Sequence, residues 1–196
     1  EELNKLFLEV IIANGFNRDA LKLLKKKKNL RLIDATNYSF KEILRFLSSN
    51  EELLVQTEDF KKFSNKDFKI VSKRKPTSKQ MKNLIFAFNI CRYVKSNAIV
   101  LASNETTAGI GSGQPSRLDS CYIAIDKMKK FMHTNADVVA ASDAFFPFVD
   151  GIEKLVQSGV TAVIQPAGSI RDKEIINFAN ETDTILVFSK TRHFRH

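Results

Sequence analysis

The stretch Lys95-Ser96-Asn97-Ala98-Ile99-Val100-Leu101-Ala102 is followed at a short distance by Gly109-Ile110-Gly111-Ser112-Gly113-Gln114-Pro115-Ser116-Arg117. Residues 98–102 are apolar and rich in β-branched side chains, which predicts a short buried strand. Glycines at three alternate positions indicate a loop whose backbone approaches another group closely or takes dihedral angles that other residues resist. Ser116, with Asp119 three residues later, predicts a helix start with a capping box. Together these features predict a ligand site at the end of a sheet.

The elements around this stretch alternate between helices and strands. Thr77 and Gln80 form a capping-box pair after Pro76, which predicts a helix that runs to about residue 94. Apolar residues at helical spacing predict the buried side of a second helix: Leu118, Tyr122, Ile125 and Met128. Strands at 138–140, 160–165 and 184–188 then alternate with helices at 150–158 and 169–179. This alternation predicts a layered α/β sheet with ligand-binding loops at the carboxyl ends of its strands.

The first 72 residues are predicted to hold shorter elements. Strands are expected at 7–13, 30–33, 53–56 and 68–71, and a helix is expected to begin after an N-cap at Asn17. Phe40, Ile43, Leu44 and Leu47 recur at helical spacing, which predicts an amphipathic helix over residues 39–48. Pro76, after a basic run, marks the main boundary of the chain.

Composition indicates an ordinary globular protein, because 43% of the 196 residues are hydrophobic and 27% are charged. No apolar run is long enough to cross a membrane. Cys91 and Cys121 both lie in apolar patterns, which favours reduced, buried thiols in a cytosolic protein over a disulfide. The net charge of +9 suits either nucleic acid or a pocket for small anionic ligands. We favour the small ligands, because no aromatic-basic RNA platform accompanies the lysines.

Several residues have both a structural and a functional interpretation. The amide of Asn97 can bond its own backbone at a turn, or it can hold a substrate carboxamide. Lys95 and Arg117 can be solvated charges, although a cation in the first turn of a helix suggests a nearby anion. The aromatic loop at 143–150 can plug the core or provide flat walls for a pterin. The tail Arg192-His193-Phe194-Arg195-His196 can be a frayed basic end or a ligand for phosphate.

Three strings resemble one family. They are Arg74-Lys75-Pro76-Thr77, Val94-Lys95-Ser96-Asn97-Ala98-Ile99-Val100 and Gly111-Ser112-Gly113-Gln114-Pro115-Ser116-Arg117, and they resemble the bifunctional AICAR transformylase/IMP cyclohydrolases of purine biosynthesis. The resemblance implies an α/β/α sandwich of the cytidine deaminase-like type. Residues 1–72 would then be the end of the first transformylase lobe and a linker, and residues 73–196 would be the second lobe.

The same resemblance implies the reaction and its partners. A formyl group would pass from 10-formyltetrahydrofolate to AICAR, in a cytoplasmic parent enzyme that is a homodimer and binds neither nucleic acid nor membrane. It implies catalytic roles for Asn97 and Lys95. The AICAR ligands implied are Asn97, Arg117, Phe145, Arg192 and His196. The folate ligands implied are Phe145, Pro147, Phe148 and Asp150. A K⁺ ion is expected near Ser96, Asp143 and His193, and no other metal.

The resemblance also points to an absence. The family transfers protons with a Lys-His pair that lies upstream of these strings, and this chain contains no Lys-His dipeptide. The chain is therefore expected to begin inside the transformylase, to lack the cyclohydrolase domain and to be inactive alone. The alternative function is a non-catalytic basic α/β module that binds RNA or nucleotides. A second alternative is a deaminase-like hydrolase, and the absence of the zinc-binding strings that it needs argues against it.

Overall fold

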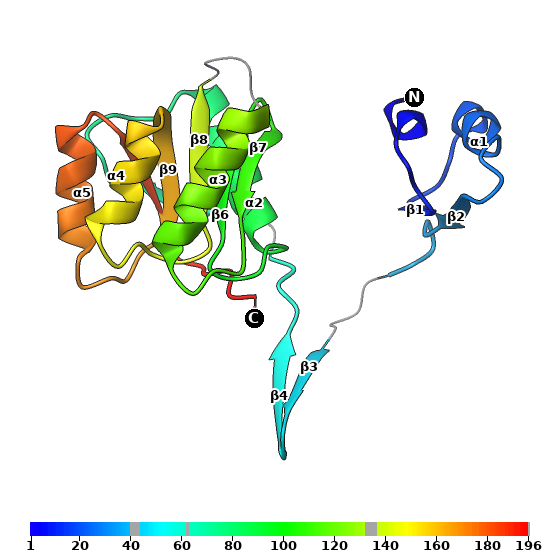
Figure 1. Cartoon of the computed structure of the whole chain (residues 1–196), viewed down its shortest axis with the longest axis horizontal. Coiled ribbons are helices and arrows are strands. Elements are labelled where there is room, and N and C mark those ends of the chain that lie inside the picture. The colour runs from blue at the N-terminus through cyan, green and yellow to red at the C-terminus, as the bar shows by residue number, and fades with distance from the viewer. Residues whose placement is uncertain (40–43, 62, 132–136, 196) are drawn as a thin grey trace. The chain divides into compact units, whose positions relative to one another are not determined.

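The computed structural model describes residues 1–39, 44–61, 63–131 and 137–195 (Figure 1). It divides the chain into two compact units, Glu1–Glu58 and Asp59–His196, which are described separately below. The predicted lobes, 1–72 and 73–196, concern a larger enzyme and stay a prediction. Among the helices that the structure describes, none has both the length and the apolar character that a bilayer crossing requires.

The first unit opens with a small β–α–β arrangement. A 3₁₀ turn, η1 (Glu2–Lys5), precedes strand β1 (Val10–Ala13), helix α1 (Arg18–Leu24) and strand β2 (Arg31–Asp34), and the two strands pair in parallel. The side chain of Asn17 accepts a hydrogen bond from the Ala20 amide at 2.7 Å, which confirms the predicted N-cap. Strand β1 begins at Val10, so it is shorter than the predicted 7–13.

The second part of this unit is a hairpin, and it corrects the helix predicted over residues 39–48. Residues 40–43 lie outside the described residues, but Leu44–Ser49 forms strand β3 and pairs antiparallel with β4 (Glu52–Thr57). Asn50 has φ of +51°, a conformation that asparagine tolerates and that tight hairpin turns require. Cross-strand pairs such as Phe46 with Val55 therefore outweigh the helical spacing of the apolar residues.

The second unit is built on one mixed sheet. Among the described residues its six strands run in the order β5-β10-β9-β8-β6-β7. Strands β8, β9 and β10 are mutually parallel, whereas β6 is antiparallel to both of its neighbours and β5 is antiparallel to β10. The strands are β5 (Phe68–Ile70), β6 (Ile99–Ser103), β7 (Thr106–Gly111), β8 (Val138–Ser142), β9 (Val160–Pro166) and β10 (Ile185–Ser189), and a 3₁₀ turn, η2 (Asn65–Asp67), precedes β5.

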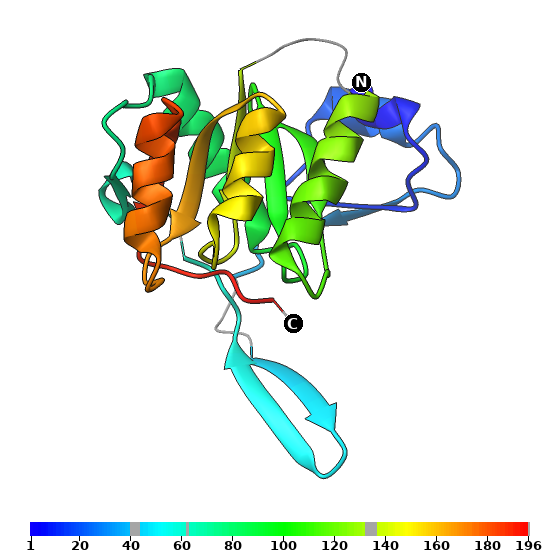
Figure 2. The same ribbon diagram turned by 60° about the vertical axis from the view of Figure 1, so that its left-hand side comes forward.

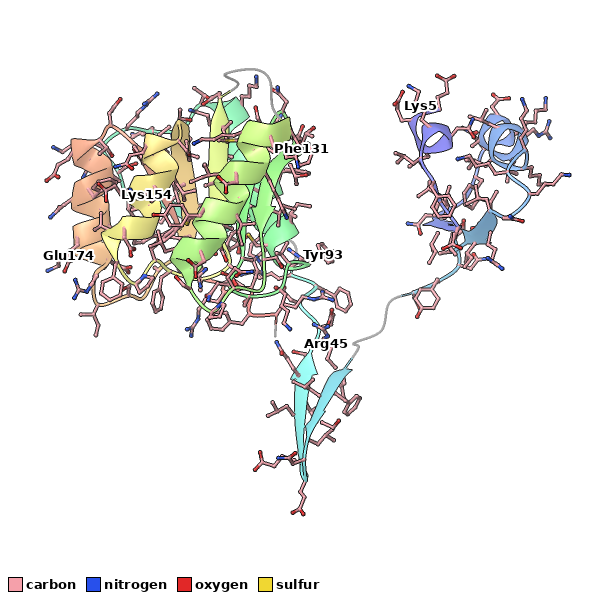
Figure 3. All side chains as sticks on the ribbon, viewed as in Figure 1. Lys5, Arg45, Tyr93, Phe131, Lys154 and Glu174 are labelled. Carbon is pink, nitrogen blue, oxygen red and sulfur yellow. The ribbon has the colours of Figure 1, made fainter. Side chains whose placement is uncertain are left out.

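Helices cover both faces of this sheet, which confirms the predicted α/β/α layering (Figures 1 and 2). One face carries α2 (Ser78–Cys91) and the other carries α3 (Arg117–Phe131), α4 (Val149–Gln157) and α5 (Asp172–Glu181). Each face has its own buried apolar cluster, one under α2 and one under the other three helices. Glu174 and Lys154 mark α5 and α4 in Figure 3. The capping box of Thr77 and Gln80 begins α2 as predicted, but the helix ends at Cys91, short of residue 94.

Two of the three glycines lie in a strand, not in the predicted loop. A Cβ atom at Gly109 would lie 2.1 Å from the Ala124 carbonyl oxygen, and one at Gly111 would lie 1.9 Å from that of Ser120. These glycines therefore let β7 approach the backbone of α3, whereas the predicted ligand loop is confined to the residues after Gly111. The buried side of α3 also differs from prediction, because Tyr122 is 44% exposed and its neighbour Cys121 is buried.

Candidate functional site

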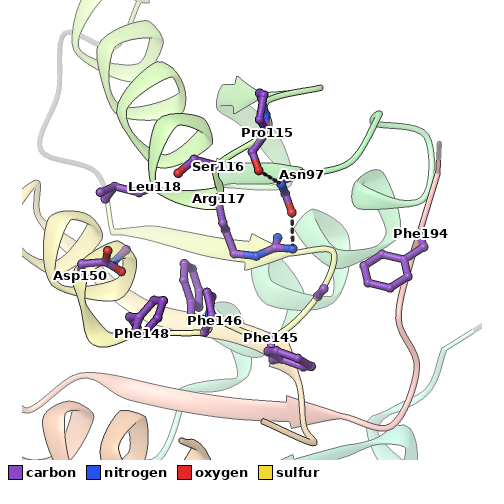
Figure 4. Close-up of a pocket in the computed structure, with 13 residues that line it drawn as sticks. Asn97, Pro115, Ser116, Arg117, Leu118, Phe145, Phe146, Phe148, Asp150 and Phe194 are labelled. Carbon is purple, nitrogen blue, oxygen red and sulfur yellow. Dashed lines mark hydrogen bonds between the residues drawn. The ribbon is translucent and has the colours of Figure 1, made fainter.

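One edge of the large sheet collects loops from every part of the second unit. The parallel strands β8, β9 and β10 end there, β7 also ends there, and the antiparallel β6 begins there. A cavity of about 470 Å³ opens at this edge (Figure 4). It is lined by Asn97, Pro115, Ser116, Arg117, Leu118, Ala144, Phe145, Phe146, Pro147, Phe148, Asp150, Gly151 and Phe194.

Arg117 forms the charged floor of this cavity. It lies in the first turn of α3, where the helix dipole disfavours a cation unless an anion compensates. Nη1 of Arg117 forms an ion pair with the fully buried carboxylate of Asp143 and donates to the Ser142 hydroxyl at 2.9 Å. The Asp143 carboxylate thus supplies the compensating anion from within the chain.

The side-chain amide of Asn97 is engaged by the protein on both sides. Its Oδ1 accepts from Nη2 of Arg117 at 2.7 Å. Its Nδ2 donates to the carbonyl oxygen of Gln114 at 2.8 Å. It also donates to that of Pro115 at 3.0 Å (Figure 4). Both N–H groups of the amide are therefore used, while its oxygen retains a second lone pair. The amide therefore bonds the backbone of a loop 17 and 18 residues away, not its own backbone, and substrate binding by Asn97 stays a prediction.

Aromatic side chains form the opposite wall. Phe146 is buried at the base of the cavity, and its amide donates to Oε1 of Gln165 at 3.3 Å, which ties the loop after β8 to the end of β9. Phe148 is 52% exposed at the rim, where the guanidinium of Arg171 lies 4.8 Å from its ring centroid. Part of the predicted aromatic loop is therefore core, and part lines the cavity.

Asp150 places a carboxylate beside these rings. It lies in the first turn of α4, and its Oδ1 accepts from the Gly151 amide at 2.7 Å. Like Pro147, it is exposed and lines the cavity, as the sequence-based assignment to one pocket requires. The wall can therefore offer an acceptor to a ligand amine next to flat apolar surfaces.

The carboxyl-terminal segment returns to the same edge. The Ser96 amide donates to the Arg195 carbonyl at 2.8 Å, and the His193 amide donates to the Asp143 carbonyl at 2.9 Å. Phe194, between these two anchors, lines the cavity. The central stretch, the phenylalanine loop and the tail thus converge on one cavity.

His193 holds this segment through its side chain as well. Its buried ring packs on Phe88, with centroids 4.4 Å apart, and Nδ1 forms a hydrogen bond with the Asp59 carboxylate. Burial lowers the pKa of His193 below its ordinary value, against the opposing effect of the Asp59 contact. The imidazole is therefore biased toward its neutral form.

Two other predicted site residues, Lys95 and Arg192, are not among the described residues that line the cavity. Lys95 is exposed, and its carbonyl accepts from the Gly113 amide at 2.8 Å, so its backbone shapes the loop. Arg192 is exposed with its guanidinium 5.4 Å from the Phe194 ring centroid. His196 lies outside the described residues.

The three residues expected near a K⁺ ion, Ser96, Asp143 and His193, lie in contact with one another through Asp143. The Ser96 hydroxyl bonds the Asp143 carboxylate, and the His193 backbone contacts the same residue. Arg117 already pairs with that carboxylate, however, and the described residues hold no cluster of three His, Cys, Asp or Glu suited to a metal. K⁺ binding stays a prediction.

Sequence reasoning missed two participants. Phe194 lines the cavity with an aromatic side chain. It lies between Arg192 and His196 in the sequence, and because both were predicted AICAR ligands, this position could have indicated its role. Asp59 pairs with His193 across 134 residues, and no local pattern marks it.

Comparison with known proteins gives a family match over much of the chain. The family described as AICARFT/IMPCHase bienzyme matches residues 1–127. Proteins named "Bifunctional purine biosynthesis protein PurH" are 44% identical over 197 residues in Caldicellulosiruptor saccharolyticus and 43% identical over 196 residues in Aquifex aeolicus. A PurH protein of Buchnera aphidicola is 44% identical over 198 residues. Each alignment covers 100% of this chain and 38% of the relative, so the chain spans about 38% of the length of these relatives.

Proposed function

Because the chain belongs to the AICARFT/IMPCHase bienzyme family, we propose that its cavity is part of an AICAR formyltransferase site that binds a folate and AICAR. The reaction is the transfer of a formyl group from 10-formyltetrahydrofolate to the exocyclic amine of AICAR. One observation supports this most: Asn97, the phenylalanine loop and Phe194, which are far apart in sequence, line one cavity at the ligand-binding edge of an α/β sheet.

The folate is assigned to the aromatic wall. A pterin is flat and carries an exocyclic amine, so it matches rings such as Phe145 and Phe148 beside the Asp150 carboxylate. Stacking on an aromatic face orients the bicyclic pterin ring, and the Asp150 carboxylate accepts a hydrogen bond from its exocyclic amine. Pro147 closes the same wall without adding a donor.

AICAR is assigned to the side of Asn97. Both N–H groups of this amide are bonded to loop carbonyls. Asn97 can therefore accept a hydrogen bond from an N–H group of the substrate carboxamide, but it cannot donate one to the carboxamide oxygen. Arg117 holds Asn97 in place, so we assign it a positioning role in addition to the ligand role predicted from the sequence. Arg192, near Phe194, is the proposed ligand for the nucleotide phosphate.

The contribution of these residues is orientation. The AICAR amine is a weak nucleophile, because its lone pair is delocalised into the ring and the carboxamide. Holding it against the formyl carbon can lower the barrier by up to about 7–11 kcal/mol.

Proton transfer, usually worth about 10²–10⁴-fold, needs a positioned acid–base group. The family pair for this step, Lys-His, does not occur in this sequence. We therefore expect this chain alone to bind ligands without turnover. Homodimerisation and a cytoplasmic location belong to the same proposal.

Calorimetry with AICAR and with 10-formylfolate tests this assignment. We expect the 196-residue chain to bind both, and Asp150→Asn to weaken the folate alone. Asp126→Asn, on the exposed side of α3, is the matched control and should change neither affinity. Failure of the chain to bind either ligand would refute the site. Salt-sensitive RNA binding with no response to AICAR would instead favour the alternative function. Release of tetrahydrofolate by the chain alone would refute the expected inactivity.

A further inference from the structure

We propose that Arg171, at the rim of the cavity, binds the carboxylates of the folate's glutamate tail. The inference rests on the proposed function and adds a specificity residue to it. Arg171 lies outside the cavity wall, but it contacts Phe148, which is part of that wall.

The backbone around Arg171 is held in a defined turn between β9 and α5. The Asp172 carboxylate accepts from the amides of Gly168 at 2.8 Å and Ser169 at 3.3 Å. The Ser169 hydroxyl in turn accepts from the Arg171 amide at 3.1 Å. These bonds anchor the base of the Arg171 side chain, so the turn sets the direction from which it reaches the rim.

The guanidinium lies over the ring of Phe148, with its central carbon 4.8 Å from the ring centroid. Contact of this kind with an aromatic face limits the motion of an otherwise flexible side chain. Arginine suits this arrangement better than lysine, because its planar fork can stack on a ring and still present donors along its edge.

Arg171 keeps donors for a ligand. Nη1 donates to Oε2 of Glu174 at 3.2 Å, in a pair whose side chains are 47% and 55% exposed. Exposed pairs of this type contribute only about 0–1 kcal/mol. A guanidinium has five N–H groups, so a ligand carboxylate can share it with Glu174 or replace that contact. Asp150 and Asp172 are the other nearby carboxylates in the rim loops, and both already accept backbone N–H groups.

A folate is longer than its pterin, so with the pterin on the aromatic wall we place its glutamate end at the rim, where Arg171 contacts Phe148. At about 470 Å³ the cavity is in the lower part of the range of about 300–1,000 Å³ for small-molecule sites. Under the assignments above, a pterin on the aromatic wall beside Asp150 and AICAR on the Asn97 side share this space. The aminobenzoyl group and the glutamate then extend outward past Phe148. A glutamate carries two carboxylates at neutral pH, and bidentate contact with arginine is their preferred pairing.

Two ligands that differ only in the tail test this inference. 10-Formylfolate carries one glutamate, whereas the primary amide of 10-formylpteroate carries no carboxylate, and both would be titrated into this chain by calorimetry at low ionic strength. We expect wild type to bind 10-formylfolate about 2–5-fold more tightly than the pteroate amide, as for one exposed ion pair. Arg171→Ala should abolish this preference and leave binding of the pteroate amide unchanged.

Two further variants separate a specific contact from general charge. Arg171→Lys should keep part of the preference, because it retains the charge without the fork. Lys173→Ala removes an equal charge two residues away, and it should keep the full preference. Equal affinity of wild type for the two ligands, or a preference that survives Arg171→Ala, would overturn the inference and leave the pterin site intact. Failure of wild type to bind either ligand would remove the folate site itself and this inference with it.

Discussion

Nη2 of Arg117 donates to Oδ1 of Asn97 at 2.7 Å, so the asparagine predicted to bind substrate is held in place by the buried arginine of the cavity. Arg117 is in turn neutralised by Asp143. The chain of contacts Asp143–Arg117–Asn97 links three different segments, and it ends on the Asn97 amide oxygen, which retains a second lone pair for a ligand.

The buried ion pair should dominate local stability. Arg117→Met leaves the Asp143 carboxylate buried without its cation, which should reduce the free energy of unfolding by about 3–5 kcal/mol. Arg74→Met breaks an exposed pair with Asp183 and should cost at most about 1 kcal/mol. Urea denaturation measures both. Adding Asp143→Asn to Arg117→Met should restore part of the loss, and an equal effect of the two single arginine variants would contradict this account.

Removing the amide of Asn97 should affect both stability and AICAR binding. Asn97→Ala leaves Nη2 of Arg117 and two loop carbonyls without their partner, so we expect a loss of about 1–3 kcal/mol. Weaker binding of AICAR should accompany it, while folate binding persists. Asn177→Ala, on the exposed side of α5, is the control and should change neither quantity. Unchanged AICAR affinity in Asn97→Ala would show that Asn97 is structural only.

Gly111 should tolerate no side chain. A Cβ atom there would lie 1.9 Å from the Ser120 carbonyl oxygen, so Gly111→Ala must push α3 away from β7. We expect a loss of about 1–3 kcal/mol or more, measured by thermal or urea unfolding. Gly113→Ala meets only the Lys95 side chain, at 3.7 Å, and should show the strain of its φ of +69° alone, about 1–2 kcal/mol. A smaller effect at Gly111 than at Gly113 would be inconsistent with close helix–strand contact.

The attachment of the tail should weaken in mild acid. The pKa of His193 is lowered by burial, so the folded chain holds this proton less tightly than the unfolded chain, whose histidine has a pKa near 6.5. Unfolding therefore takes up a proton between the lowered pKa and about 6.5, and stability falls as the pH falls through this window. Above it the contribution is complete.

Comparison of wild type with His193→Leu between pH 5 and 7.5 measures this contribution. We expect the slope of unfolding free energy against pH to be smaller in the variant. Asp59 and Asp143 favour the protonated ring and Arg92 disfavours it, but the burial effect is the largest. Identical slopes in the two proteins would rule out His193 as the titrating group.

Both thiols should be inert in the folded chain. Burial raises the pKa of Cys121 to about 12, and that of Cys91 well above its ordinary value. The reactive thiolate is therefore scarce at neutral pH, and the sulfur atoms are shielded. A chromogenic disulfide reagent should modify neither cysteine under native conditions and both in denaturant. Rapid native labelling would mean that the core under α2 or α3 opens readily.

The prediction of the fold from sequence succeeded where the signals are local. The capping box at Thr77, the apolar run before Ser103 and the alternation after residue 138 all depend on contacts within a few residues, and each produced the expected element. It failed for residues 44–48, because their apolar spacing fits a helix as well as a strand. The partner strand β4, not the local pattern, decided between them.

The sequence by itself determined most helices and strands of the second unit, that a layered sheet results, and that one edge of it would gather the loops that line the cavity, because each of these depends on periodicity, caps and chain order. Only the tertiary structure decided what the polar groups at that edge contact. Gly111 serves a helix and not a ligand, Asn97 has no N–H left to donate, and His193 finds Asp59 134 residues away. Such pairings depend on distances in space between remote segments, and a linear pattern does not contain them.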